Sequence, residues 1–155
     1  MIIQVDSREK ARAIEKILRE FDKQGIKHIS SKLYAGDYID MEHPLLIIDR
    51  KQNIREIASN VTSEHQRFKA ELEKVKEIGA RMIILIEEDT IDGKPIESLE
   101  DIMLWEPKAG QGTVSGMRVY KILANWVRVY PLEVQFCNKR HTGKRIIEIL
   151  GGSNE

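Results

Sequence analysis

Residues 36–51, GDYIDMEHPLLIIDRK, decide the fold of this chain because they predict two strands joined by a tight turn. Acidic residues occur at Asp37 and Asp49, and Lys51 follows two residues after the second acid. Side chains alternate between the two faces of a strand, so Asp49 and Lys51 are expected on one face and Arg50 on the other. One surface of the second strand therefore carries both a carboxylate and an ammonium group.

The turn over residues 41–44 sets the register of the two strands. If the pairing is centred on His43, Asp37 lies opposite Asp49, and two carboxylates then converge with the lysine. Such a pair of carboxylates suits a hard divalent cation, Mg²⁺ or Mn²⁺, and a nearby lysine can activate a water or stabilise charge on a phosphate. The pattern predicts metal-assisted phosphodiester hydrolysis. The alternative interpretation is an edge strand that leaves the core with solvated charges.

Three short motifs follow one another in the chain, V-D-S-R-E, G-D and D-R-K at residues 5–9, 36–37 and 49–51. Arg67 with Glu71 four residues later, and the apolar run RMIILIE at residues 81–87, come next. In this order they resemble the nuclease domain of XPF/Hef-type structure-specific endonucleases, a branch of the PD-(D/E)XK superfamily. The pattern of that family is V-D-x-R-E, G-D and E-R-K-x-x-x-D, followed by R-x-x-x-Q and an apolar strand.

This resemblance implies an α/β fold with a mixed central sheet flanked by helices, as in restriction endonucleases. It implies a metal-dependent DNA endonuclease, with Mg²⁺ or Mn²⁺ as cofactor, that acts on branched or otherwise structured DNA. One nuclease domain is expected over residues 1–150, followed by a flexible tail over residues 151–155. The expected metal ligands are Asp37, Asp49 and Asp6. The expected catalytic residues are Asp6, Arg8, Asp37, Asp49, Arg50 and Lys51.

The chain departs from the family pattern at two acidic positions. Asp49 stands where the family usually has Glu, and Arg55, with Glu56 next to it, stands where the family has an acid. The tandem helix-hairpin-helix tail that such proteins often use to bind DNA and dimerise is also not seen. These departures leave open a catalytically silent DNA-binding or assembly subunit that keeps the nuclease fold, although the joint presence of the acids and the lysine favours the enzyme. An α/β protein unrelated to nucleic acid is a further alternative.

Charge is distributed unevenly, although 25 basic residues balance 25 acidic residues. Zero net charge argues against a bulk polycation that binds nucleic acid indiscriminately. Residues 83–106 contain eight acids and one lysine, whereas residues 107–145 contain eight bases and one acid. The basic segment can form a phosphate-facing surface, unless the two segments pair with each other. The expected DNA contacts are Arg67, Lys139, Arg140, Lys144 and Arg145.

The composition excludes several other classes of protein. A hydrophobic content of 41% in 155 residues is sufficient for a sizeable core. No apolar run approaches the roughly 18 residues of a membrane span, and Asp6 and Arg8 interrupt any signal peptide, so a cytoplasmic protein is expected. The single cysteine, Cys137, lies in a strand-like run and is expected to be a buried apolar residue rather than a nucleophile.

Apolar spacing predicts the remaining elements. A helix capped by Ser7 is expected to continue to Gly25, and a helix capped by Ser63 is expected to end at Gly79. Residues 117–130 are apolar on nearly every side, which predicts either burial within the chain or a homodimer or partner subunit that covers this helix. The other expected elements are strands at residues 2–6, 27–32, 82–86 and 132–137, helices at residues 54–61 and 99–105, and a last helix from residue 142.

Overall fold

The structure, a computed structural model, describes residues 1–152. None of the helices in this part of the chain is long and apolar enough to cross a membrane. The elements in chain order are β1 (Ile2–Val5), α1 (Glu15–Lys23), β2 (Lys27–Ser30), β3 (Tyr38–Asp40), β4 (His43–Lys51), α2 (Ile54–Val61), α3 (His65–Glu77), β5 (Arg81–Ile86), β6 (Thr90–Ile91), β7 (Lys94–Pro95), a 3₁₀ helix η1 (Leu99–Leu104), α4 (Gly116–Val129), β8 (Leu132–Phe136) and α5 (Thr142–Gly152).

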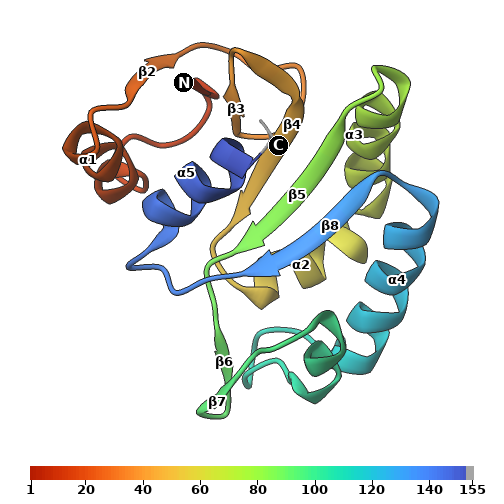
Figure 1. Cartoon of the computed structure of the whole chain (residues 1–155). Coiled ribbons are helices and arrows are strands. Elements are labelled where there is room, and N and C mark those ends of the chain that lie inside the picture. The colour runs from red at the N-terminus through yellow and green to blue at the C-terminus, as the bar shows by residue number, and fades with distance from the viewer. Residues whose placement is uncertain (153–155) are drawn as a thin grey trace.

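Six of the strands form a mixed sheet in the order β2-β1-β3-β4-β5-β8. β1 pairs in parallel with β2 and antiparallel with β3, and β3 pairs antiparallel with β4. β4, β5 and β8 then run parallel to one another. Helices α1 and α5 cover one face of the sheet, and α2, α3 and α4 cover the other (Figure 1). The predicted mixed sheet flanked by helices is confirmed.

Strand β5 shows why the protein has a hydrophobic core on each side of the sheet. Met82, Ile84 and Ile86 pack against the core under α2, α3 and α4, whereas Ile83 and Leu85 pack against the core under α1 and α5. All five side chains are buried. A strand that is covered on both faces needs consecutive apolar residues. The uninterrupted apolar run in the sequence is therefore explained by the position of β5 inside the sheet.

Helix α1 begins later than the sequence predicts. The expected helix starts after Ser7, but residues 7–8 and 11–14 form turns and α1 starts at Glu15. The backbone N–H of Arg8 donates to Asp6 Oδ2 at 3.3 Å, and the Arg8 side chain bonds the same carboxylate. These local hydrogen bonds compete with a helical turn. The prediction that Ser7 caps a helix is therefore wrong.

Two further predictions about the ends of helices are wrong. Ser63 does not cap α3, because its hydroxyl donates to Ser59 O at 3.3 Å and the N-cap is Glu64. Residues 151–152 were expected in a tail, but α5 continues through them. The remainder of the expected tail, residues 153–155, lies outside the described residues.

Helix α4 contains the apolar residues that predict a partner, and it lies against η1, β8 and α2. Val119, Leu123 and Trp126 are buried within the chain. Met117 and Val129 are 45% and 50% exposed. The chain itself therefore covers one side of α4, and a homodimer or partner subunit stays a prediction.

Candidate active site

The hairpin of β3 and β4 has the register that the sequence predicts. Tyr38 pairs with Ile48, so Asp37 lies opposite Asp49. The pairing shifts only near the turn, where a bulge interrupts the ladder. The Asp37 carboxylate also accepts a hydrogen bond from the backbone N–H of Arg50 at 2.7 Å. Backbone pairing alone therefore brings the two carboxylates together, without the need for an interaction between side chains.

Gly36 has a structural reason to precede Asp37. Its φ angle is +71°, and a Cβ atom at this position would lie 2.3 Å from Ile47 Cγ2 and 3.1 Å from Ile48 O. Only glycine satisfies both the left-handed backbone and the close approach to β4. The Gly36 N–H donates to Glu71 Oε1 at 2.8 Å, which ties the start of the hairpin to α3.

Asp49 and Lys51 lie on the face of β4 that packs against α3. Asp49 is 5% exposed, and its buried Oδ2 atom has no hydrogen-bond partner. Lys51 Nζ forms an ion pair with this oxygen at 3.0 Å. Lys51 Nζ also lies 5.1 Å from the centre of the Phe68 ring. Burial alone would lower the pKa of Lys51, but the charge of Asp49 and its side-chain contact with Lys51, together with the charges of Glu56 and Asp37, raise the pKa, so the ammonium group stays charged.

Four carboxylates, those of Glu9, Asp37, Asp49 and Glu71, lie in this region, and several of them repel one another. Burial, followed by the charges of Asp49 and Glu9, raises the pKa of Asp37 well above its usual value. Burial, followed by the charge of Asp49, also raises the pKa of Glu71, while Lys51 acts in the opposite direction. Groups that disfavour each other's ionised form in this way are typical of sites that bind a cation.

A cavity of about 390 Å³ opens beside these carboxylates. Five residues that the sequence predicts for catalysis or DNA binding line it, namely Asp6, Arg8, Asp37, Asp49 and Arg67. Lys51 does not line the cavity, but its ammonium group pairs with the carboxylate of Asp49, which does. The cavity has room for part of a substrate and for water around a cation. The structure thus brings most of the predicted site residues into one place.

Asp6 holds Arg8 at the edge of the cavity. Arg8 Nε donates to Asp6 Oδ2 at 2.8 Å and Arg8 Nη2 to Asp6 Oδ1 at 3.2 Å, and the N–H of Leu33 donates to Asp6 Oδ1 at 2.8 Å. Burial alone would raise the pKa of Asp6, but these hydrogen bonds lower it. The Arg8 side chain is 61% exposed. Both oxygens of Asp6 are therefore occupied, so its geometry favours orienting Arg8, and its predicted role as a metal ligand stays a prediction.

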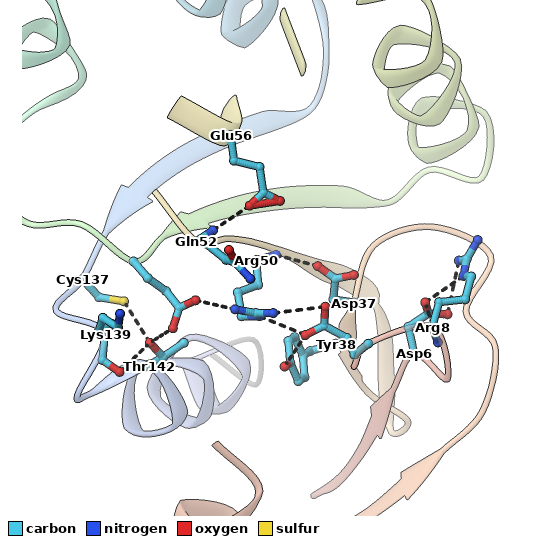
Figure 2. A network of polar contacts seen from close by, with 12 residues as sticks. Asp6, Arg8, Asp37, Tyr38, Arg50, Gln52, Glu56, Cys137, Lys139 and Thr142 are labelled. Atoms are coloured by element: carbon cyan, nitrogen blue, oxygen red, sulfur yellow. Dashed lines mark hydrogen bonds and ion pairs between the residues drawn. The ribbon is translucent and has the colours of Figure 1, made fainter. Parts of the chain in front are cut away.

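The Arg50 side chain points to the opposite face of β4, as predicted, and joins a network of polar side chains there (Figure 2). Its guanidinium pairs with Glu9 at 2.9 Å and with Glu87. Tyr38 OH donates to Glu9 at 2.8 Å, and Thr142 Oγ1 donates to Glu87 at 2.6 Å. Burial alone would lower the pKa of Arg50, but the hydrogen bonds and charges of the two glutamates have the larger combined effect, so the pKa is raised. Every charge in this network has an opposite charge or a hydrogen-bond donor beside it.

The predicted basic contacts lie on different sides of the molecule. The Arg67 side chain is 87% exposed, lines the cavity and pairs with Glu64 at 3.4 Å rather than with Glu71. Lys139 borders a second cavity that contains Arg50. Lys139, Arg140 and Lys144 are exposed, whereas Arg145 is partly buried and pairs with Glu148 at 3.0 Å. None of the ion pairs within residues 1–152 joins the acidic segment 83–106 to the basic segment 107–145.

Sequence reasoning missed the role of several residues in these two sites. Glu71 appears in the sequence only as the residue four positions after Arg67, with no role of its own predicted, yet it lines the cavity. Glu87 and Thr142 are 55 positions apart and meet only in the folded chain, so no local pattern identifies them as neighbours. Glu9 could have been identified from the sequence as a residue near the site, because it belongs to the V-D-S-R-E motif and directly follows Arg8.

A different acidic group lies at the turn of the hairpin. Within the described residues, only Asp40, Glu42 and His43 place three possible ligand atoms within 4.8 Å of one another. Asp40 Oδ1 already accepts hydrogen bonds from the N–H groups of Ile2 and Glu42, at 3.4 Å and 3.1 Å. The Asp40 carboxylate also lies 3.3 Å from His43 Nδ1. These contacts explain the cluster as a structural element of the turn.

The mixed sheet, its two layers of helices and the acidic cavity at the β3–β4 hairpin place the protein in the class of α/β proteins with the fold of XPF. The chain belongs to the ERCC4 domain family, which matches residues 5–150. The resemblance inferred from the motifs is thereby confirmed. Comparison with curated proteins found no match.

Two solved structures of XPF from Aeropyrum pernix are similar to this chain. One has a TM-score of 0.69 and 18% sequence identity, and the match covers 100% of this chain and 66% of that chain. The other, a complex with DNA, has a TM-score of 0.65 and 17% identity, with 99% and 64% covered. At these identities the comparison shows the fold, and the chain spans about two thirds of the length of those proteins.

Proposed function

We propose that residues 1–150 form a metal-dependent DNA endonuclease domain that acts on branched or otherwise structured DNA. One observation carries this proposal, the buried Asp49 Oδ2 atom without a hydrogen-bond partner beside the carboxylate of Asp37. A buried oxygen without such a partner costs free energy, and Lys51 alone balances fewer charges than the carboxylates supply. A divalent cation accounts for this arrangement because it neutralises both carboxylates at once.

The residues present fit such a cation. Asp37 and Asp49 offer hard oxygen ligands from opposed positions in one hairpin, beside a cavity that admits water. Mg²⁺ or Mn²⁺, when bound, polarises a phosphate and lowers the pKa of a water. These two carboxylates would hold it, and backbone pairing fixes both before binding. This preorganisation is what a positioned catalytic site requires.

Lys51 and Arg8 have distinct roles in the proposed reaction. Lys51 is held in its charged form next to Asp49, so it orients the attacking water and stabilises the negative charge that develops on the phosphate. Arg8 is fixed by Asp6 but projects from the cavity edge, where it can bind a phosphate of the DNA backbone. Arg67, on the exposed side of the same cavity, provides a second phosphate contact.

Membership of the ERCC4 domain family and the fold shared with XPF from Aeropyrum pernix, solved in complex with DNA, support nucleic acid as the substrate. The net charge of zero agrees with recognition of a particular DNA structure rather than indiscriminate binding. Arg50 supports the site from behind, because its backbone N–H donates to Asp37 while its side chain is engaged on the other face.

The direct test is incubation of the purified protein with nicked, flapped, forked and linear DNA, in Mg²⁺ or Mn²⁺ and in EDTA. We expect cleavage of at least one branched substrate in the presence of metal, no cleavage in EDTA, and strongly reduced cleavage by an Asp49→Ala variant at the same metal concentration. Cleavage that persists in EDTA would contradict the metal dependence. A protein that binds DNA but cleaves no substrate with either metal would instead be a silent DNA-binding subunit.

A further inference from the structure

Tyr34 differs from the other aromatic residues of the chain in its exposure. The chain contains three Phe, four Tyr and two Trp residues, all within the part that the structure describes. Tyr34 is the only one of them that is exposed, at 57%, whereas Tyr38, four residues later, is completely buried. A single exposed apolar side chain needs no functional explanation by itself. Tyr34, however, lines the cavity that also contains Asp37 and Asp49.

The backbone on both sides of Tyr34 is held by hydrogen bonds. Leu33, the residue before it, is buried, and its N–H donates to Asp6 Oδ1 at 2.8 Å. The N–H of Gly36, two residues after Tyr34, donates to Glu71 Oε1 at 2.8 Å. Tyr34 is therefore presented to the cavity by a segment that is anchored at both ends, and its exposure does not result from a loosely packed loop.

One side of α3 lines the same cavity as Tyr34. Four residues of the helix, spaced three or four positions apart and so aligned along one face, contribute to it, namely Arg67, Ala70, Glu71 and Lys74. Lys74 Nζ lies 5.2 Å from the centre of the Tyr34 ring. This cation–π contact favours one orientation of the ring. Because Tyr34 remains 57% exposed, the contact leaves much of the ring accessible to a ligand.

Three exposed cations accompany the ring in this cavity. Arg8 and Arg67 have side chains that are 61% and 87% exposed, and Lys74 is exposed as well. Arg8 is fixed by the carboxylate of Asp6 (Figure 2). An aromatic ring beside exposed cations is the combination by which proteins bind a single strand of nucleic acid, because the ring stacks on a base while the cations contact the neighbouring phosphates.

An unpaired nucleotide is the part of a branched DNA that can use this ring. A base inside a duplex has a neighbouring base on each face, so a side chain can stack on it only after the base has been displaced. A base in a flap or at a fork offers an open face to an aromatic side chain. The cavity volume of about 390 Å³ lies within the range of sites that bind small organic groups.

We propose that Tyr34 stacks on an unpaired base of the DNA and thereby favours substrates with unpaired nucleotides next to the site of cleavage. This inference rests on the proposed function, because that function makes DNA the ligand of the cavity. Tyr34 acts here as a substrate-binding residue and takes no part in binding metal or moving protons. It belongs to none of the V-D-S-R-E, G-D and D-R-K motifs, so the motifs by themselves do not identify it.

The test is fluorescence anisotropy with a flapped DNA and with a linear duplex that has no unpaired nucleotide, in EDTA to prevent metal-dependent cleavage. The proteins are the parent, Tyr34→Ala, Tyr34→Phe and Leu45→Ala. Leu45→Ala is a matched control, because Leu45 is 54% exposed but lines a different cavity. If binding requires Mn²⁺, the same titrations are made with Lys51→Ala added to each protein, so that the DNA is cleaved slowly.

Tyr34→Ala should bind the flapped DNA about 5- to 150-fold more weakly than the parent, the loss expected for one base stacked on an aromatic residue. Its affinity for the linear duplex should be unchanged. Tyr34→Phe keeps the ring, so it should bind both DNAs like the parent, as should Leu45→Ala. The melting temperature of Tyr34→Ala should stay close to that of the parent because the side chain is exposed.

A direct measurement of stacking uses 2-aminopurine at the unpaired positions next to the branch, since its fluorescence falls when it stacks. Quenching should occur with the parent and Tyr34→Phe but not with Tyr34→Ala. Parental affinity of Tyr34→Ala for the flapped DNA would overturn the inference, while metal-dependent cleavage by the parent would leave the proposed function standing. Equal losses on flap and duplex, or an equal loss in Tyr34→Phe, would also contradict stacking. A parent that binds neither DNA, with or without Mn²⁺, would overturn both.

Discussion

The charged residues on the two faces of β4 differ in how completely they are paired. On the face toward α1 and α5, Arg50 is paired with Glu9 and Glu87, and these glutamates accept further hydrogen bonds from Tyr38 and Thr142. On the face toward α3, two aspartates are opposed across the hairpin and a buried carboxylate oxygen has no hydrogen-bond partner. Arg50 thus belongs to a network in which every charged group is paired. Its neighbour Asp49 belongs to a site in which a buried oxygen has no hydrogen-bond partner.

This difference separates groups that stabilise the fold from groups that are available for chemistry. A buried polar network in which each member is satisfied makes the native arrangement specific and gives no reason to infer a ligand. A site with unpartnered groups lowers stability, and proteins retain such sites where function requires them. We therefore expect substitutions on the Arg50 face to affect stability and those on the Asp49 face to affect activity.

The largest effect is expected from Lys51 and Asp49. Lys51→Ala should slow single-turnover DNA cleavage by ~10²–10⁴-fold while Mn²⁺ binding is retained or strengthened, because a positive charge leaves the site. Asp49→Ala should instead weaken Mn²⁺ binding, with partial recovery of cleavage in excess Mn²⁺. DNA binding should survive in both variants. Equal metal affinity in Asp49→Ala and the parent would show that Asp49 is not a ligand.

On the opposite face, Arg50→Met should lower the free energy of unfolding by about 3–5 kcal/mol, because Glu9 and Glu87 would be left buried without their cation. Chemical denaturation of the parent and the variant measures this difference. Mn²⁺ binding measured below the melting transition should change little. A variant with parental stability but no Mn²⁺ binding would reverse the proposed division between the two faces.

Gly36→Ala should disturb the hairpin and with it the cavity. We expect a loss of about 2–5 kcal/mol in the free energy of unfolding, because the left-handed backbone and the contact with Ile47 are both unfavourable for alanine. Gly79→Ala is the matched control, since Gly79 has the same φ of +71° but no atom within 4 Å of the added Cβ. Equal losses in the two variants would show that close packing against β4 contributes nothing.

Much of the hairpin could be predicted from the sequence because its determinants are local. Strand alternation and one turn place Asp37 opposite Asp49, and the observed pairing confirms this register. The start of α1 could not be predicted in the same way, because Arg8 binds Asp6 in preference to a helical turn. The position of Glu71 depends on how α3 packs against the hairpin, and helical spacing cannot determine that contact.

The smallest effect, a change in DNA affinity and its salt dependence, is expected from the basic residues on the two faces of the sheet. Neutralising Lys139, Arg140, Lys144 and Arg145 together should weaken DNA binding and reduce the slope of log affinity against log salt by about one unit for each phosphate that the protein no longer neutralises. Arg67→Ala, on the cavity side, should reduce the slope by about one unit. Affinity measured over a salt series distinguishes the two. An unchanged slope in the fourfold variant would place the DNA away from the basic segment.

The most direct test of the metal site is thermal unfolding of the parent and Asp37→Asn, each in EDTA and in saturating Mn²⁺. Asparagine keeps an acceptor for the N–H of Arg50 but removes one of the repelling charges, so the variant should melt at or above the temperature of the parent in EDTA. Mn²⁺ should raise the melting temperature of the parent by about 5–10 °C and that of Asp37→Asn by much less. Equal shifts in both proteins, or no shift in the parent, would contradict the proposal that the opposed aspartates of this hairpin hold a divalent cation.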